Sequence, residues 1–91
     1  MNMAVRFIVQ ARSHPQALAR IINHVAQLGI TPKRVCADEN NGIMTIFMEQ
    51  DGICDRQARI IAEKMYTSVL VQKVKLIRGE SQLASLNRQA Q

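Results

Sequence analysis

Four segments of the chain alternate between apolar and polar residues, and each predicts a β-strand: 4–11, 30–38, 43–50 and 69–77. In the first segment, Val5, Phe7 and Val9 share one face, while the opposite face is mixed. In the last segment, Val74 and Leu76 share one face in the same way. Because strand side chains point alternately to two sides, we expect these apolar faces to be buried.

Between the first two segments, apolar residues recur at steps of three and four, which predicts an amphipathic helix from Pro15 to Gly29. Proline suits the first helical position, and glycine readily adopts the left-handed conformation that ends a helix. Unpaired N–H groups at the helix start make the turn at 12–16 the predicted place for a small anion. The predicted inward stripe holds Leu18, Ile21, Ile22, Val25 and Leu28.

A second helix is predicted from Ile53 or Asp55 to Tyr66. Asp55 either caps this helix or lies in its first turn, where a negative charge is favourable. The predicted inward stripe holds Cys54, Ala58, Ile61, Ala62 and Met65.

Two pairs of residues predict turns. Asn41-Gly42 lies between two strand patterns and is a strong hairpin signal, because both residues tolerate the positive φ of a tight turn. Asp51-Gly52 predicts a turn that leads into the second helix.

The predicted element order is β-α-β-β-α-β, which indicates an α+β, ferredoxin-like fold with four antiparallel strands and both helices on one face. The uncovered face carries Ile8, Phe47 and Ile77 among polar residues. An uncovered face or strand edge of this kind often binds a partner, so we expect a homodimer or a higher oligomer. The predicted domain spans 1–79, and a polar tail follows over 80–91.

Composition narrows the function classes. The chain has 91 residues, 47% of them hydrophobic, and a net charge of +5, which suits an acidic partner. The basic residues are scattered rather than gathered in one run, which argues against a nucleic-acid partner.

No apolar stretch is long enough for a membrane span and no signal segment begins the chain, so the prediction is a cytoplasmic protein without a membrane partner. Cys36 and Cys54 are expected to be small apolar residues in or near the core.

No combination of residues predicts catalysis or a metal site. His14 and His24 lie ten residues apart in one helix and its preceding turn, too far apart to share a metal ion. No acid–base partner is recognisable near Ser13, and none of the glycines belongs to a phosphate-binding loop. We therefore predict a protein without its own active site.

RNA binding is an alternative that the fold leaves open. RNA-binding domains with this topology stack bases on aromatic residues of their sheet. Phe7 and Phe47 lie on the first and third predicted strands, but Phe7 alternates with valines as a core residue does.

The motif Pro15-x-x-Leu18-x-Arg20-Ile21, followed by Gly29-Ile30, resembles the ACT domain, a small regulatory module that binds amino acids. Over residues 4–78 the chain is similar to the small regulatory subunit of acetohydroxyacid synthase (acetolactate synthase), and most of all to short forms such as that of enterobacterial isozyme II. The resemblance implies a non-catalytic protein that dimerises and activates a large catalytic subunit in branched-chain amino-acid biosynthesis. It implies no cofactor in this chain, and thiamine diphosphate, FAD and Mg²⁺ in the catalytic subunit.

The resemblance also marks candidate effector residues: Ser13, His14, Pro15, Gln16, Ala17 and Thr31. Family members that bind valine carry Asn, Gly and Asn where this chain has Ser13, Gln16 and Thr31. The glycine lets the ligand's carboxylate approach the backbone, and the Gln16 side chain crowds that approach. We therefore expect weak or no sensitivity to valine.

Two further alternatives stay open at this stage. One is a stand-alone ACT module that senses an amino acid for another partner, and the other is a dimerisation module that binds no ligand.

Overall fold

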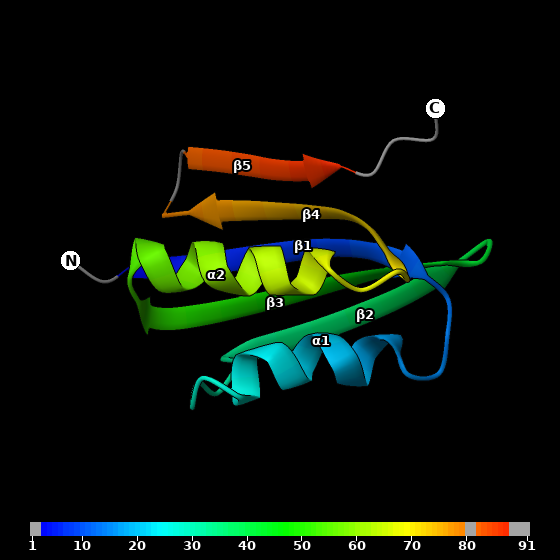
Figure 1. Ribbon diagram of the computed structural model, residues 1–91, viewed down its shortest axis with the longest axis horizontal. Helices are drawn as coiled ribbons and strands as arrows, with labels where there is room; N and C mark the ends of the chain where they lie inside the picture. Colours follow the sequence, from blue (N-terminus) through cyan, green and yellow to red (C-terminus); the bar gives the residue numbers. More distant parts are fainter. Residues whose placement is uncertain (1–2, 80–81, 88–91) are drawn as a thin grey trace.

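The computed structural model describes residues 3–79 and 82–87, and Figure 1 shows how its elements are arranged. In chain order they are β1 (Met3–Arg12), α1 (Ala17–Ala26), β2 (Arg34–Asn40), β3 (Ile43–Ile53), α2 (Asp55–Tyr66), β4 (Val71–Arg78) and β5 (Gln82–Asn87).

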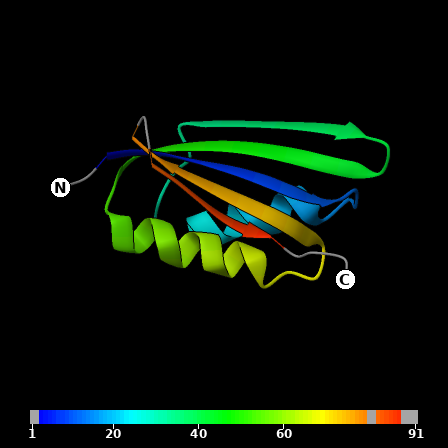
Figure 2. The ribbon, with the colours of Figure 1, turned by 90° about the horizontal axis from the view of Figure 1, so that it is seen from above.

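The strands form one antiparallel sheet in the order β2-β3-β1-β4-β5. Both helices cover the same face of this sheet, as Figure 2 shows from above. The first four strands and the two helices form the predicted ferredoxin-like fold, which is confirmed. The opposite face has no helix over it and is called the open face below.

The core lies between the sheet and the helices, and the strand pattern predicted its members. Val5, Phe7 and Val9 are completely buried, and Val74 and Leu76 are nearly so. On α2, the four buried residues all belong to the predicted stripe: Ala58, Ile61, Ala62 and Met65.

The first helix differs from the prediction at both ends. It begins at Ala17, whereas Pro15 and Gln16 form a turn before it, because the N–H of Ala17 donates to the His14 carbonyl at 3.0 Å. It ends at Ala26, so Leu28 lies beyond the helical periodicity and is 39% exposed rather than inward.

The strand β2 begins at Arg34, four residues later than predicted from Ile30. Pro32 has no N–H to donate to the sheet. Backbone pairing with β3 therefore starts after it, where the Lys33 N–H donates to the Glu49 carbonyl at 2.8 Å. Cys36 is exposed in this edge strand, in register with Phe47 of β3, which corrects its expected burial. Cys54 is half-buried.

The hairpin at Asn41-Gly42 is confirmed, with φ angles of 53° and 81°. The predicted turn at Asp51-Gly52 is wrong, because β3 continues through it to Ile53. The register between β1 and β3 gains one residue there, and Gly52 has a φ of 72°, so the pair forms part of a β-bulge.

The segment predicted as a tail contains a strand. Residues 82–87 pair with β4, which supplies partners for backbone groups that would otherwise lie at a sheet edge. The polar tail is thereby corrected for 82–87, and the rest of the predicted tail (80–81 and 88–91) lies outside the described residues. Among the described residues, neither helix is long and apolar enough to cross a membrane.

Candidate functional site

The loop between β1 and α1 carries most of the predicted effector residues. It is held by two backbone hydrogen bonds of 2.8 Å, from Arg12 N–H to the Leu70 carbonyl and from Ser13 N–H to the Gly42 carbonyl. These bonds place the loop beside the β2–β3 hairpin and the segment that precedes β4. The backbone of the loop is therefore anchored to the hairpin and to the segment before β4, whereas its side chains are exposed.

His14 lies two residues before Gln16, the N-cap of α1, and accepts hydrogen bonds from the first backbone N–H groups there. Its carbonyl accepts the N–H of Ala17, and its ring atom Nδ1 accepts the N–H of Gln16, each at 3.0 Å. The Gln16 side chain in turn accepts a hydrogen bond of 2.9 Å from Arg20 Nη2. Ala17 is buried, so its methyl group belongs to the core rather than to the exposed loop.

Thr31 lies at the opposite end of α1 from these residues. A helix of ten residues, such as Ala17–Ala26, is about 15 Å long. The structure thus brings Ser13, His14 and Gln16 together in one loop but leaves Thr31 apart from them within a single chain.

Gln50 positions the Thr31 segment, and the sequence interpretation missed this role. Its side chain is completely buried, and its Nε2 donates to the Thr31 carbonyl at 3.2 Å. Its Oε1 is buried without a hydrogen-bond partner among the residues that the structure describes. The available signal was its position, since Gln50 continues the inward alternation of Ile46 and Met48 as a polar residue.

Two shallow hollows follow the exposed side of α1. The first, about 400 Å³, is lined by Gln16, Ala19, Arg20 and Asn23. The second, about 220 Å³, lies between α1 and the end of α2 and is lined by Arg20, Asn23, His24, Thr67 and Ser68. Because they share Arg20 and Asn23, the two hollows adjoin along α1, and the first also reaches Gln16 of the effector loop; together they are called the groove below.

His24 lines this groove, and its surroundings change the pKa of its imidazole. Partial burial lowers the pKa of its imidazole below the ordinary value of 6.5, and the nearby Lys64 ammonium lowers it further. Its Nδ1 atom is buried and has no hydrogen-bond partner in the described part of the chain.

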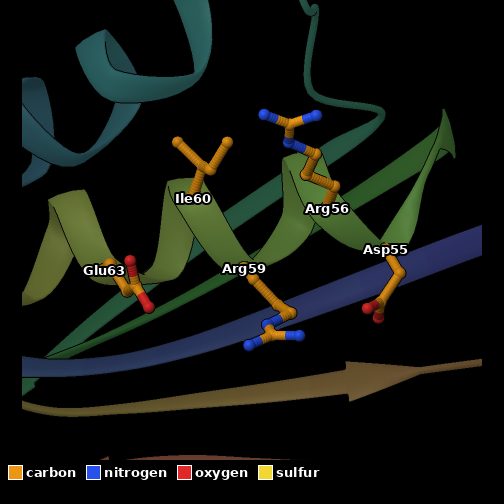
Figure 3. A pocket seen from close by; sticks show the side chains of 5 residues that line it. All are labelled: Asp55, Arg56, Arg59, Ile60 and Glu63. Carbon is orange, nitrogen blue, oxygen red and sulfur yellow. The ribbon is translucent and has the colours of Figure 1, made fainter.

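A third hollow, of about 360 Å³, lies on the outer side of α2 (Figure 3). In the close-up, Arg56 and Ile60 point to one side of the helix, and Asp55, Arg59 and Glu63 point to the other. The two arginines and two carboxylates that line it balance in formal charge, and Asp55 also forms an ion pair with Arg78.

The open face combines apolar and basic residues. Ile8 of β1 is in register with Phe47 of β3 on one side and with Lys75 of β4 on the other. Arg6 extends this face, and its Nη2 donates to the Gly79 carbonyl at 3.2 Å. Phe7 is completely buried on the helix-covered face, so it is excluded as the second stacking aromatic that the RNA-binding alternative requires.

No group of His, Cys, Asp and Glu side chains that could hold a metal ion occurs among residues 3–79 and 82–87.

Comparisons with known proteins identify a family for this chain and solved structures with the same fold. A profile of the family described as "ACT-like domain" matches residues 1–83. No curated protein sequence matches the chain.

Three solved structures share its fold. The ACT domain of the GTP pyrophosphokinase of Chlorobium tepidum is 9% identical, with a TM-score of 0.74 over 85% of this chain and 100% of that one. An uncharacterized protein of Thermotoga maritima is 9% identical, with a TM-score of 0.71 over 86% of this chain and 98% of that one. The C-terminal domain of the MgtC protein of Mycobacterium tuberculosis is 16% identical, with a TM-score of 0.68 over 87% of this chain and 89% of that one.

Proposed function

Because this chain belongs to the family of ACT-like domains, we propose that it is a regulatory module that senses an amino acid and acts on a partner enzyme in the cytoplasm. The observation that carries this proposal is the exposed β1–α1 loop, anchored by backbone bonds from Arg12 and Ser13. A loop with a fixed backbone and free side chains can present donors and acceptors to a ligand without first becoming ordered.

The regulatory form is a homodimer or a higher oligomer. Ser13 and Thr31 belong to opposite ends of α1, so a ligand that contacts both groups at once requires a second copy of the chain. The edge strands of the sheet are β2 and β5, and we propose β2 for that contact because it directly follows the Thr31 segment.

The partner that we propose is the large catalytic subunit of acetohydroxyacid synthase. This choice rests on the resemblance of the Pro15–Ile21 motif and of the Gly29-Ile30 pair to the small subunits of that enzyme. Thiamine diphosphate, FAD and Mg²⁺ then belong to the catalytic subunit, and this chain changes activity by binding two states of its partner with different affinity.

The open face is the proposed docking surface. Phe47 and Ile8 supply apolar area. Around them the cations Arg6, Arg34, Lys73 and Lys75 outnumber the carboxylates Glu49 and Asp38, which leaves this face net positive. Two such faces repel each other, which favours an acidic surface of a different protein over a second copy of this chain. Association is therefore expected to slow as salt is added.

Valine is a poor effector in this proposal. An effector carboxylate near the start of α1 competes for the Gln16 N–H, which the His14 ring already accepts. The Gln16 side chain, held by Arg20, occupies space that a glycine leaves open at this position.

The test is co-purification with the acetohydroxyacid synthase catalytic subunit, followed by activity assays with and without valine. We expect a complex, activation, and little change on adding valine. Lys75→Glu should slow association, while Arg59→Glu, on the outer side of α2, serves as the matched control. The absence of both complex and activation contradicts this partner. Amino-acid binding by the isolated chain in that case favours a stand-alone sensor.

A further inference from the structure

The groove between α1 and the C-terminal end of α2 gathers positive charge. Arg20 and His24 lie one turn apart on α1, and Lys64 of α2 acts electrostatically on His24. No carboxylate lines this hollow among the described residues. The hollow on the outer side of α2, which is lined by two arginines and two carboxylates, differs in this respect although it is larger.

Capping of the C-terminal end of α2 does not explain why basic side chains gather in this groove. Cations often lie at a helix C-terminus because its last carbonyls carry partial negative charge. Here the Lys64 carbonyl accepts both the N–H and the hydroxyl of Thr67, at 3.1 and 2.6 Å, and the Met65 carbonyl accepts the Ser68 N–H at 3.3 Å. Since these carbonyls have partners of their own, the basic side chains do not serve as their caps.

We propose that this groove binds a small oxyanion, such as a phosphate monoester or sulfate, through Arg20, Asn23 and His24, while Lys64, which lies outside the lining, adds positive charge at longer range. An anion beside Arg20 and His24 offsets the repulsion between the Lys64 ammonium and a protonated His24 ring, and so favours the protonated ring. The Asn23 amide lines the same hollow and can donate a further hydrogen bond. The hollow at His24 is not lined by Ser13, His14 or Gln16, although the adjoining hollow reaches Gln16, and the proposal does not depend on the acetohydroxyacid synthase assignment.

The size of the hollow limits the ligand. Its volume of about 220 Å³ lies below the range of about 300–1,000 Å³ that is typical of sites for larger organic molecules. The charged group of the ligand therefore occupies this hollow, and any organic part extends into the adjoining 400 Å³ hollow, which reaches Gln16. Arg20 joins the two, because it lines both hollows and donates to Gln16 Oε1.

The direct test is an NMR titration of the full chain with potassium sulfate, against potassium chloride at matched ionic strength. Sulfate is the probe because it keeps its charge at about pH 5.5 and at about pH 7.5, so that a change in affinity reports the protein. We expect saturable shifts at Arg20, Asn23, His24 and Lys64–Ser68, with a Kd several-fold lower at the acidic pH because protonated His24 adds a positive charge.

Three variants make the test specific. Arg20→Gln should raise the Kd for sulfate about fivefold or more. His24→Gln should abolish the pH dependence of the Kd while the chain stays folded. Arg59→Gln removes an exposed arginine from the electrically balanced hollow of α2 and should leave the Kd unchanged.

The absence of saturable shifts overturns the proposal, as do equal shifts around Arg59. A Kd that is the same at both pH values overturns the role of His24.

Discussion

The side chain of Gln50 holds the backbone of Thr31: Nε2 donates to the Thr31 carbonyl at 3.2 Å across 19 residues of sequence. One end of this pair is completely buried, and the other is an exposed candidate effector residue. The contact therefore connects the core to the segment that enters β2, and it suggests how a change at that segment reaches the sheet.

Gln50→Leu should separate the stability of the domain from the order of this segment. The leucine removes a buried Oε1 without a partner in the described structure, which offsets the lost hydrogen bond, so the free energy of unfolding should change by less than about 1 kcal/mol. Thr31 loses its side-chain tie to β3, while the Lys33 N–H keeps its bond to the Glu49 carbonyl, so the amide hydrogens of Ile30 and Thr31 should exchange faster. Hydrogen-exchange mass spectrometry and urea unfolding measure the two effects.

Gln50→Ala is the matched comparison for this prediction. It removes the same hydrogen bond but leaves a cavity, and should cost about 2–4 kcal/mol. Unchanged exchange at Ile30 and Thr31 in both variants would show that Gln50 does not hold the segment.

Gly42→Ala should destabilise the hairpin through the backbone alone. Gly42 has a φ of 81°, and an added Cβ meets no atom within 4 Å. The expected cost is the strain of a left-handed conformation, about 1–2 kcal/mol, which thermal unfolding detects. Asn41→Gly is the control, since Asn41 also has a positive φ and glycine relieves it without a new side chain. Equal unfolding temperatures for Gly42→Ala and the unmodified chain would refute this explanation.

Local pattern was sufficient to predict the fold. The alternation in β1 placed Val5, Phe7 and Val9 on the buried face, and the spacing in α2 placed Ile61 and Met65 there. These predictions succeeded because burial follows the period of the backbone, which is two in a strand and 3.6 in a helix.

The parts that sequence did not predict depend on contacts between distant residues. Gln50 meets Thr31 only when β3 passes beside the segment after α1, and β5 exists as a strand because it pairs with β4. The turn before α1 contains the hydrogen bond from the Gln16 N–H to the His14 ring, which no periodicity indicates. The candidate site combines such contacts, so only its loop residues could be predicted from a motif.

The stability of the domain should depend on the protonation of His24. Burial lowers the pKa of this imidazole below 6.5, and Lys64 lowers it further, so the folded state binds its proton less readily than the unfolded state. The stabilising effect of the neutral ring is therefore complete above about pH 6.5 and is lost as the pH falls through the lower pKa of the folded state. His24→Gln should flatten this part of the curve of unfolding free energy against pH.

Lys64→Gln provides an independent check on the cause. It removes the smaller of the two effects and should raise the pKa of His24 toward 6.5 without reaching it, because burial remains. NMR titration of the His24 ring protons measures this shift. A pKa of His24 at or above 6.5 in the unmodified chain would contradict both parts of the prediction.

Alanine substitution should destabilise the domain far more at Phe7 than at Phe47. Phe7 is completely buried under the helices, so Phe7→Ala should lower the free energy of unfolding by about 3–5 kcal/mol. That loss is a large part of the free energy of unfolding of a typical domain, which is about 5–15 kcal/mol. Phe47 is half-buried on the open face, and Phe47→Ala should cost about 1 kcal/mol or less. Urea unfolding of the two variants tests this difference.

The Phe47→Ala variant then tests docking in a folded protein. An aromatic residue at the centre of an interface typically contributes about 2 kcal/mol or more to binding, so its loss should weaken the complex with the catalytic subunit without unfolding this chain. Calorimetry of the complex, with Ile60→Ala on the outer side of α2 as a control, separates the two surfaces. If Phe47→Ala binds as tightly as the unmodified chain while Ile60→Ala does not, the partner docks on α2, because the open face then contributes no binding energy.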